Sequence, residues 1–237
     1  MKQNIVILTG AGISAESGIK TFRDSNGLWE NHAIEDVATP EGFARNPSLV
    51  YRFYNARRAQ LHDKNVAPNL GHDALVKLEQ SDGFDVAIIT QNVDNLHERA
   101  GSKKVLHMHG ELLSALCMYS NQRTYYKDDF DHTTECSCCQ RKGGLRPDIV
   151  WFGEVPMYMD EIQSLIEQAT HFVAIGTSGQ VYPAAGFVNF AKQLGITTTE
   201  INLVPSDNNY LFDHTYVGPA SEAVPQFVND LINNKNN

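Results

Sequence analysis

The sequence predicts an α/β fold built on a parallel β-sheet, with a smaller domain inserted in it. Four short apolar runs rich in β-branched residues read as strands, at 4–9, 85–90, 171–177 and 197–203. Stretches with helical periodicity separate them, and we expect helices at 48–62, 71–80, 159–169, 184–194 and 220–233. Strands that are apolar throughout and alternate with helices are typical of a parallel sheet covered on both faces.

Two stretches, 20–70 and 113–146, interrupt the alternation of strands and helices. The first holds a polar loop and the helix expected at 48–62, and the second holds all four cysteines. We therefore expect two domains, each discontinuous in the sequence. The larger combines residues 1–25, 71–112 and 147–237, and the smaller combines residues 26–70 and 113–146.

The composition is that of an ordinary globular protein, with 42% hydrophobic and 20% charged residues among 237. A net charge of -9 argues against a nucleic-acid-binding protein, which needs a basic surface. No apolar run reaches the length of a membrane span, and the run after Met1 and Lys2 is too short for a secretory signal. We therefore expect a cytoplasmic protein without a membrane or nucleic-acid partner. The oligomeric state does not follow from the sequence, and a monomer is the working expectation.

A glycine-rich stretch, TGAGISAESG, directly follows the first expected strand. It places Gly10, Gly12 and Ala15 at the three small positions of the turn with which a Rossmann-type domain binds a pyrophosphate. A turn that needs glycine only for its backbone is the alternative. The polar loop IKTFRDSNGLWE comes next, where a dehydrogenase would have a second strand ending in an acidic residue. This departure argues against hydride transfer.

Six motifs occur in order along the chain: GAGISAESGIKTFRDSNGLW, TQNVDNLHERAG, HMHGEL, VWFGE, GTSGQVYPAA and INL. Together they resemble the sirtuins, NAD-dependent protein lysine deacylases, from Gly10 to about Ala220. The likeness is greatest to bacterial members that remove acidic acyl groups as well as acetyl. It implies a Rossmann-type NAD-binding domain and a small helical plus zinc-ribbon domain. It also implies that lysine deacylation consumes NAD and yields nicotinamide, O-acyl-ADP-ribose and free lysine.

The resemblance implies that NAD is the co-substrate and that several segments bind it. The implied residues are Gly10, Ala11, Gly12, Ser14, Ala15, Thr21, Phe22, Arg23, Trp29, Gln91, Asn92, Asp94, Gly176, Thr177, Ser178, Asn202, Leu203, Val204 and Ala220. Phe22 and Arg23 would belong to a lid. Asn92 would contact the ribose as a catalytic residue, and Asp94 would contact the carboxamide. For residues 176–178 and 202, an ordinary turn at a strand end is the alternative.

His109 is the residue that we expect to carry proton transfer. In the resembling family the acyl oxygen attacks C1′ of the nicotinamide ribose, and a histidine then takes a proton from a ribose hydroxyl. An imidazole suits this step because its ordinary pKa lies near neutrality. His107, two residues away, should point to the opposite side of an extended segment, and we interpret it as structural.

The expected helix at 48–62 carries an unusual pair of residues in its apolar stripe. Val50, Tyr54, Arg57 and Leu61 follow the helical spacing of one face. In the resembling subclass a Tyr-x-x-Arg pair holds the carboxylate of succinyl or malonyl groups, which here implies Tyr54 and Arg57, with Ala38 leaving room for the acyl chain. The alternative is a solvated helix in which Arg57 buries only its stem, with Arg58 as its twin.

Two further motifs resemble the edges between which the family binds its peptide as an added strand. The implied substrate-binding residues are Phe152, Gly153, Glu154, Val181 and Tyr182. Backbone pairing of this kind gives affinity with little demand on sequence. The expected partners are therefore acylated-lysine proteins of many sequences.

The four cysteines lie in one short segment, which indicates a metal site in a reducing compartment. Cys136 and Cys139 form a C-x-x-C pair, and Cys117 lies at the spacing of the other half of a structural zinc site. The second half is incomplete because Ser120 stands where a cysteine is usual. We expect Cys117 and Cys136 as ligands, then Cys139, and last Cys138, because neighbouring cysteines seldom reach one centre. Water or His132 could complete the shell, and a module without zinc is the alternative.

Three other functions are compatible with parts of the sequence. An NAD-dependent oxidoreductase rests on the glycine-rich stretch alone. An ADP-ribosyltransferase would use the same scaffold, and a non-catalytic NAD-sensing module would not need His109 and Asn92. The expected function is deacylation of protein lysines, with acetyl, succinyl and malonyl as acyl groups.

Overall fold

The computed structural model describes residues 2–19 and 28–236, and they form a parallel sheet in the order β11-β10-β9-β1-β4-β5. Its strands are β1 (Gln3–Thr9), β4 (Phe84–Thr90), β5 (Val105–His107), β9 (His171–Ile175), β10 (Thr197–Asn202) and β11 (His214–Val217). The four predicted strands are confirmed. The edge strands β5 and β11 were not predicted, because they have three and four residues and β11 is largely exposed.

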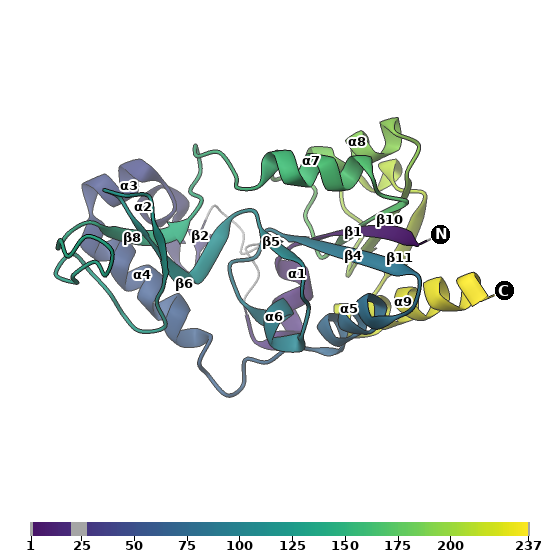
Figure 1. Ribbon diagram of the computed structural model, residues 1–237, viewed down its shortest axis with the longest axis horizontal. Helices are drawn as coiled ribbons and strands as arrows, with labels where there is room; N and C mark the ends of the chain where they lie inside the picture. The colour runs from purple at the N-terminus through teal and green to yellow at the C-terminus, as the bar shows by residue number, and fades with distance from the viewer. Residues whose placement is uncertain (1, 20–27, 237) are drawn as a thin grey trace.

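Helices cover both faces of this sheet (Figure 1). The side chains of β1 alternate between two cores: Ile5 and Ile7 pack with α5 (Leu70–Gln80) and α9 (Ala220–Asn236), and Val6 and Leu8 with α7 (Met159–Glu167) and α8 (Phe187–Gln193). This alternation follows from the period of two in a strand. The five predicted helices are confirmed, with η2 (Ala184–Gly186) leading into α8.

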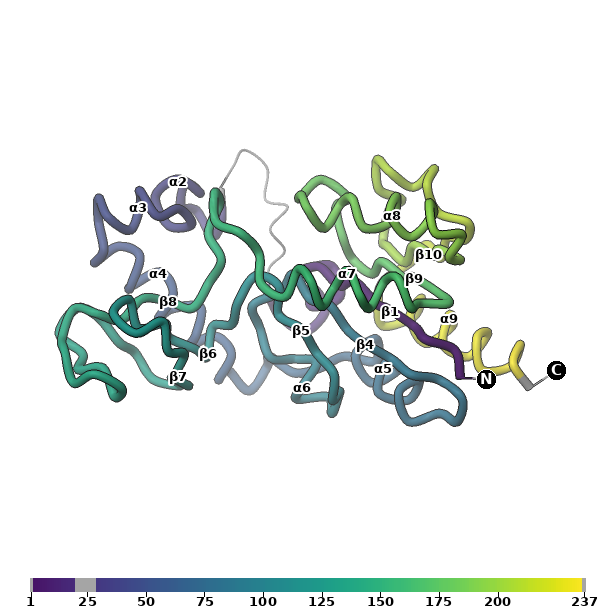
Figure 2. The backbone as a smooth tube through the Cα atoms, turned by 45° about the horizontal axis from the view of Figure 1, so that its top comes forward, coloured from purple at the N-terminus to yellow at the C-terminus, as the bar shows by residue number. Residues whose placement is uncertain are grey.

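A second group of elements lies beside one end of the sheet (Figure 2). It contains α2 (Ile34–Val37), α3 (Pro40–Arg45), α4 (Pro47–Gln60) and an antiparallel sheet of β7 (Arg123–Tyr125), β6 (Gly110–Cys117) and β8 (Leu145–Ile149). A short hairpin, β2 (Leu28–Trp29) and β3 (His32–Ala33), precedes α2. We call this group the small lobe and the parallel sheet with its helices the large lobe. The expected boundaries at 112/113 and 146/147 fall inside β6 and β8, and the division into two domains stays a proposal.

Helix α4 is the central element of the small lobe. Asn46 caps its first turn by accepting a hydrogen bond from Leu49 N at 3.1 Å, and Pro47 occupies a position where no amide hydrogen is needed. One face of α4 buries Val50, Tyr54 and Leu61, as the helical spacing predicts. The same helix contacts β6 and β8, so the two insertions lie side by side.

Short connecting elements complete the described chain: α1 (Ala11–Ser14), η1 (Ala15–Ser17), α6 (Leu96–Ala100) and η3 (Asn209–Leu211). Within the described residues, every helix is too short or too polar to cross a lipid bilayer.

Candidate active site

A cavity of about 560 Å³ lies between the two lobes, within the size range of small-molecule sites. One end is formed at the carboxyl ends of β1, β4 and β9, where ligands of open parallel sheets bind. The other end is formed by α4 and by the segment that follows β8. Of the residues expected to bind cofactor or substrate, those lining the cavity are Gly10, Ala11, Gly12, Ser14, Trp29, Ala38, Tyr54, Arg57, Gln91, Asn92, Asp94, His109, Phe152, Gly153, Glu154, Gly176, Thr177, Ser178, Val181 and Tyr182.

The floor of the sheet end is made of three interlocked glycines. A Cβ atom on Gly12 would lie 2.5 Å from Gly176 Cα, and one on Gly10 would lie 2.7 Å from Gly176 O. Gly176 has a φ of +63°, a conformation that glycine adopts without strain. The alternative reading of this turn is therefore partly right, since the glycines are needed for backbone packing. The same packing brings the 10–12 and 176–178 turns together along the cavity wall.

Asn92 is fixed at the sheet end by hydrogen bonds from both its side chain and its backbone. Its Nδ2 donates to Gly10 O at 3.2 Å and to Ser14 Oγ at 3.1 Å, and its backbone N donates to Thr90 Oγ1 at 3.0 Å. Ser14 Oγ in turn donates to Asp94 Oδ2 at 3.1 Å. Burial raises the pKa of Asp94, although hydrogen bonds from Leu96 N and Ser14 oppose that shift. Polar groups of this kind, with backbone turns beside them, fit the ribose, carboxamide and phosphate groups of NAD.

His109 lies in the turn between β5 and β6 and is held by the carbonyl of Gln91. Its Nδ1 lies 3.2 Å from Gln91 O, and a carbonyl oxygen only accepts hydrogen bonds, so Nδ1 carries the proton. Burial lowers the pKa of His109, against the smaller opposing effect of that carbonyl. The neutral ring therefore keeps an unprotonated Nε2 for use as a base.

His107 does not line the cavity, in keeping with its interpretation as structural, but it does not simply face away from the site. Strand β5 ends at His107, and the intervening turn brings both rings to one loop. His107 Nδ1 lies 3.2 Å from Asn92 O, next to the carbonyl that His109 contacts. The two rings contact consecutive backbone carbonyls, so His107 supports the loop that carries the site from outside the cavity.

At the other end of the cavity, Tyr54 and Arg57 form part of the wall together. Tyr54 is fully buried and its hydroxyl oxygen accepts a hydrogen bond from Trp151 Nε1 at 3.0 Å. Burial raises the pKa of Tyr54, so the phenol keeps its proton. The Arg57 guanidinium lies over the Phe53 ring at 4.9 Å, and its buried Nε and Nη1 find no hydrogen-bond partner among the described residues.

The alternative in which Arg58 is a solvated twin of Arg57 is wrong. Arg58 is 1% exposed, its Nε donates to Leu112 O at 2.9 Å, and its Nη1 donates to Asn55 Oδ1 at 2.6 Å. Its guanidinium also packs on the Phe130 ring, and burial lowers its pKa to about 10. Arg58 thus binds α4 to the small-lobe sheet, whereas Arg57 faces the cavity.

The segment after β8 forms the cavity edge that was expected to bind peptide. Phe152 N donates to Ala38 O at 2.9 Å, which ties this edge to the residue expected to leave room for the acyl chain. Glu154 is held by both terminal nitrogens of Arg146, at 2.7 and 2.9 Å, and it accepts a bond from Trp151 N. Although burial alone would raise the pKa of Glu154, Arg146 lowers it overall. Glu154 therefore shapes the turn, while Phe152 and Tyr182 are exposed beside the cavity.

Some expected cofactor residues do not line the cavity in the structure. Thr21, Phe22 and Arg23 lie outside the described residues. Asn202 is buried behind the 176–178 turn and donates to Thr177 O at 2.7 Å. The other expected residues that do not line it are Ala15, Leu203, Val204 and Ala220. Of these four, only Ala15 is next in the chain to a lining residue, Ser14.

Trp151 is one of several wall residues that the sequence did not predict. It is buried, donates to Tyr54, and lies over the Arg146 guanidinium at 3.7 Å. The only signal for it in the sequence is its place inside the VWFGE motif.

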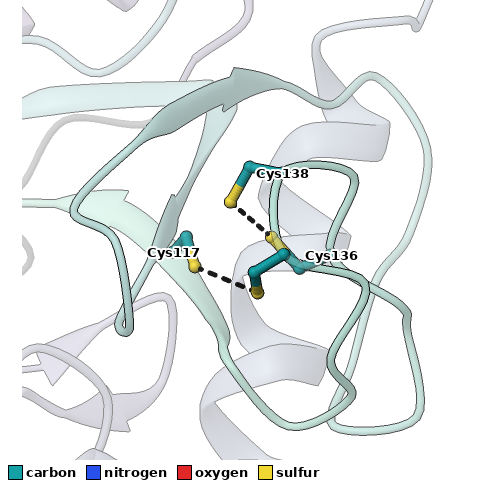
Figure 3. Close-up of side chains that lie close together, drawn as sticks. Cys117, Cys136 and Cys138 are labelled. Carbon is teal, nitrogen blue, oxygen red and sulfur yellow. Dashed lines mark hydrogen bonds between the residues drawn. The ribbon is translucent and has the colours of Figure 1, made fainter.

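The four cysteine sulfurs gather at one point in the small lobe. All four Sγ atoms lie within 4.8 Å of one another, with Cys136 and Cys138 at 3.1 Å and Cys117 and Cys139 at 3.7 Å. Figure 3 shows Cys117, Cys136 and Cys138 turned toward each other. Tetrahedral zinc with bonds near 2.3 Å keeps its sulfurs about 3.8 Å apart, so the cluster fits a structural zinc ion.

The thiols of the adjacent Cys138 and Cys139 both reach the cluster, so all four expected cysteines are placed to bind one ion. Ser120 lies beside the cluster, with Oγ 3.2 Å from Cys138 Sγ. Four sulfurs are therefore present without Ser120, and neither water nor His132 is needed to reach four ligands.

Comparison with known proteins identifies the family of the chain. The Sir2 family model matches residues 10–183. NAD-dependent protein deacylases of Bdellovibrio bacteriovorus and Salmonella typhimurium are 56% and 55% identical over 230 and 228 residues. These matches cover 97% and 96% of this chain, and 97% and 84% of the relatives.

Solved structures agree with this relationship. A Sir2 homologue–NAD complex is 36% identical with a TM-score of 0.86, covering 98% of this chain and 90% of the other. A Sir2–p53 peptide–NAD+ complex is 29% identical with a TM-score of 0.77, covering 99% and 94%. The chain therefore belongs to the Sir2 family and is an NAD-dependent protein deacylase.

Proposed function

We propose that this deacylase removes succinyl and malonyl groups, as well as acetyl groups, from protein lysines. The observation that carries the proposal is the Arg57 guanidinium. It lies in the cavity wall, and two of its buried nitrogen atoms donate a hydrogen bond to no described residue. A buried donor left without a partner costs about 1–3 kcal/mol, so a site that keeps one is suited to a ligand that supplies the acceptor.

A carboxylate at the end of the acyl chain is the ligand group that fits this position. Taking a carboxylate out of water requires charged or directed donors, and a guanidinium offers several in one plane. Tyr54 adds a further donor, because its oxygen already accepts from Trp151 and its own hydrogen is free to point elsewhere. The small side chain of Ala38 in the same wall supports room for an acyl chain longer than acetyl.

The test compares deacylation of one peptide carrying succinyl-lysine, butyryl-lysine or acetyl-lysine. Butyryl has the same chain length as succinyl without its carboxylate, so the pair isolates the charge. We expect the wild-type enzyme to prefer succinyl over butyryl, and Arg57→Met to lower the succinyl kcat/KM by about 10-fold or more, since bonds to charged groups contribute about 1.5–3 kcal/mol.

The matched control is Arg52→Met, a loss of the same charge at an exposed position of the same helix. It should leave all three rates unchanged. Equal losses on succinyl and butyryl peptides in Arg57→Met would contradict an acyl-selective role and leave only a packing role for Arg57.

For proton transfer we propose His109 as the general base and Asn92 as its partner at the ribose. NAD, when bound, supplies the ribose carbon that accepts the acyl oxygen in place of nicotinamide. His109 supports this step through its neutral ring, whose Nδ1 is occupied by Gln91 and whose Nε2 can take up a proton. Asn92 supports it through a side chain fixed by Gly10 and Ser14.

Protein substrates are proposed to bind as an added strand between residues 150–154 and 181–182. Both segments line the cavity, one on each side. Strand pairing uses hydrogen bonds to the peptide backbone, so it depends little on the amino-acid sequence of the substrate. A Sir2 relative of known structure is described with a p53 peptide, which supports a peptide site of this kind here. The cytoplasmic location stays a prediction of the sequence.

A further inference from the structure

His107 is held between two hydrogen-bond acceptors beneath the active site. Its Nε2 lies 2.7 Å from Glu98 Oε1, and its Nδ1 lies 3.2 Å from Asn92 O. The side chain of His107 is 6% exposed and that of Glu98 is 41% exposed. Glu98 belongs to α6, and Asn92 to the loop that follows β4. One imidazole therefore joins a helix to the loop that carries the proposed ribose contact.

The two acceptors determine how many protons this ring carries. A carbonyl oxygen and an ionised carboxylate only accept hydrogen bonds, whereas a neutral imidazole has one N–H to donate. Only the doubly protonated ring can donate to both Asn92 and Glu98. A proton shared between imidazole and carboxylate stays on the imidazole, because imidazole has the higher ordinary pKa.

Four hydrogen bonds fix Asn92 at three of its groups, the backbone N, the side-chain amide and the backbone O. The backbone N donates to Thr90 Oγ1, the side-chain Nδ2 donates to Gly10 O and Ser14 Oγ, and the backbone O accepts from His107. The first two depend on neutral groups that do not titrate near neutral pH. The third depends on the charge of His107.

We propose that His107 is a cation which, paired with Glu98, positions Asn92 for deacylation by holding its carbonyl. The proposal rests on the role given above to Asn92, and it makes His107 a positioning residue, since it does not line the cavity. In the neutral ring the single N–H goes to the carboxylate of Glu98, which is the stronger acceptor, so the hydrogen bond to Asn92 O is lost and the loop at residues 91–94 is held less firmly.

The charges around His107 support this protonation state. Glu98 and neutral His97 face it from α6, Asp94 from the loop after β4, and Glu111 from β6. Burial alone would lower the pKa of His107, but Glu98, Glu111 and the Asn92 carbonyl together raise it above its ordinary value. A raised folded pKa means that the cation persists to higher pH than in an ordinary histidine and is lost as the pH rises through that pKa.

The first test measures the ring directly by NMR of ¹⁵N-histidine-labelled enzyme, with His107→Gln identifying the signals of residue 107. We expect both ring nitrogens of His107 to carry hydrogen at pH 7, and its titration midpoint to lie above that of an ordinary histidine. Glu98→Gln keeps an acceptor at the same place but removes the charge. It should lower the midpoint by about 1 unit or more, as loss of an adjacent opposite charge does.

The second test follows kcat/KM with pH on an acetylated peptide. The wild-type enzyme should lose activity at alkaline pH, and Glu98→Gln should move this loss to lower pH by the same shift that NMR shows. The matched control is Glu161→Gln, the same change at an exposed position of α7, which should leave both profiles in place.

A His107 that is singly protonated at pH 7, or that titrates alike in wild type and Glu98→Gln, would overturn the proposed charge. A midpoint that moves in NMR without any movement of the activity profile would overturn the positioning role while leaving the charge intact. If His107→Gln does not fold, the Glu98→Gln signal that shifts identifies residue 107, so the test stands. Failure of the role proposed for Asn92 would appear instead as an Asn92→Ala enzyme with normal kcat.

Discussion

The two ends of the cavity differ in how far the protein satisfies its own polar groups. At the sheet end, Ser14, Asn92 and Asp94 are bonded to one another and to the backbone. At the α4 end, Arg57 keeps two buried nitrogens without a described partner. A site whose groups are already bonded holds its geometry before the ligand arrives, whereas one with an unpaired charge selects the ligand that supplies the missing partner. Changes at the sheet end are therefore expected to lower the rate on every acyl group, whereas changes at the α4 end should alter only the selectivity between acyl groups.

The largest effect should come from removing the base at the sheet end. We expect His109→Ala to lower kcat about 100-fold to 10,000-fold on every acyl peptide, as loss of a general base does. NAD binding should persist, because the bonded network of Asn92, Ser14 and Asp94 is untouched. Turnover by mass spectrometry and NAD binding by calorimetry check both parts. A loss confined to succinyl peptides would contradict the separation of the two ends.

The next largest effect concerns the cysteine cluster, which lies behind the α4 end. Cys138→Ser should lower the zinc affinity more than about 100-fold. Even the loss of a residue that only hydrogen-bonds a metal ligand lowers metal affinity about 10–100-fold. Ser120→Ala is the matched control, and it should keep one zinc per chain because four sulfurs remain. Zinc content after dialysis against a graded chelator measures both variants. Equal zinc loss in the two variants would show that Ser120 is a ligand.

Acid pH should act on the large lobe rather than the small one. Burial lowers the pKa of His72 to about 4, so the unfolded chain binds a proton between that value and about 6.5 that the folded chain does not. Stability is therefore lost as pH falls through this window, by about 2 kcal/mol at pH 5 for His72 alone. Hydrogen exchange at pH 7 and pH 5 should show faster opening of α5 and α6, which carry His72 and His97, than of α4. Uniform change in all three helices would contradict this.

The smallest effect is expected from the phenol at the α4 end. Tyr54→Phe removes one neutral donor, and such a bond contributes about 0.5–1.5 kcal/mol, so the succinyl kcat/KM should fall about 2-fold to 12-fold. The butyryl rate should stay the same, apart from any effect of leaving Trp151 Nε1 without its acceptor. Trp151→Phe in the Tyr54→Phe background separates the two contributions. A larger loss on butyryl than on succinyl would argue that Tyr54 serves only to pack.

Helical spacing predicted the shared face at the α4 end from the sequence, whereas its interpretation as a pocket came from the resemblance to a family. A period of 3.6 residues places Val50, Tyr54 and Leu61 on one buried face, and Arg57 follows that face to the cavity. The same periodicity did not reveal Arg58, because its burial depends on Leu112 and Phe130, more than 50 residues away. Charged residues are rarely buried in this way, so a solvated interpretation was the natural one.

Loop geometry accounts for the remaining differences between prediction and structure. Whether Cys138 and Cys139 reach one centre, and where His107 points, depends on turns that reverse the chain within two or three residues. Residue spacing describes regular strands and helices and carries no information about such turns. The resemblance to a family helped to predict the cysteines as zinc ligands and His109 as the base, but it did not predict the contact between His107 and Asn92.

Helix α4 presents Tyr54 and Arg57 to the cavity on one side. On the other side it presents Tyr51, Asn55 and Arg58 to β6, β8 and the loop between β7 and β8. Each residue added to or removed from a helix turns everything beyond it by about 100° and moves it by 1.5 Å. A single insertion or deletion near residue 49 would therefore misplace both faces at once. The length of this stretch of the chain is therefore expected to stay constant.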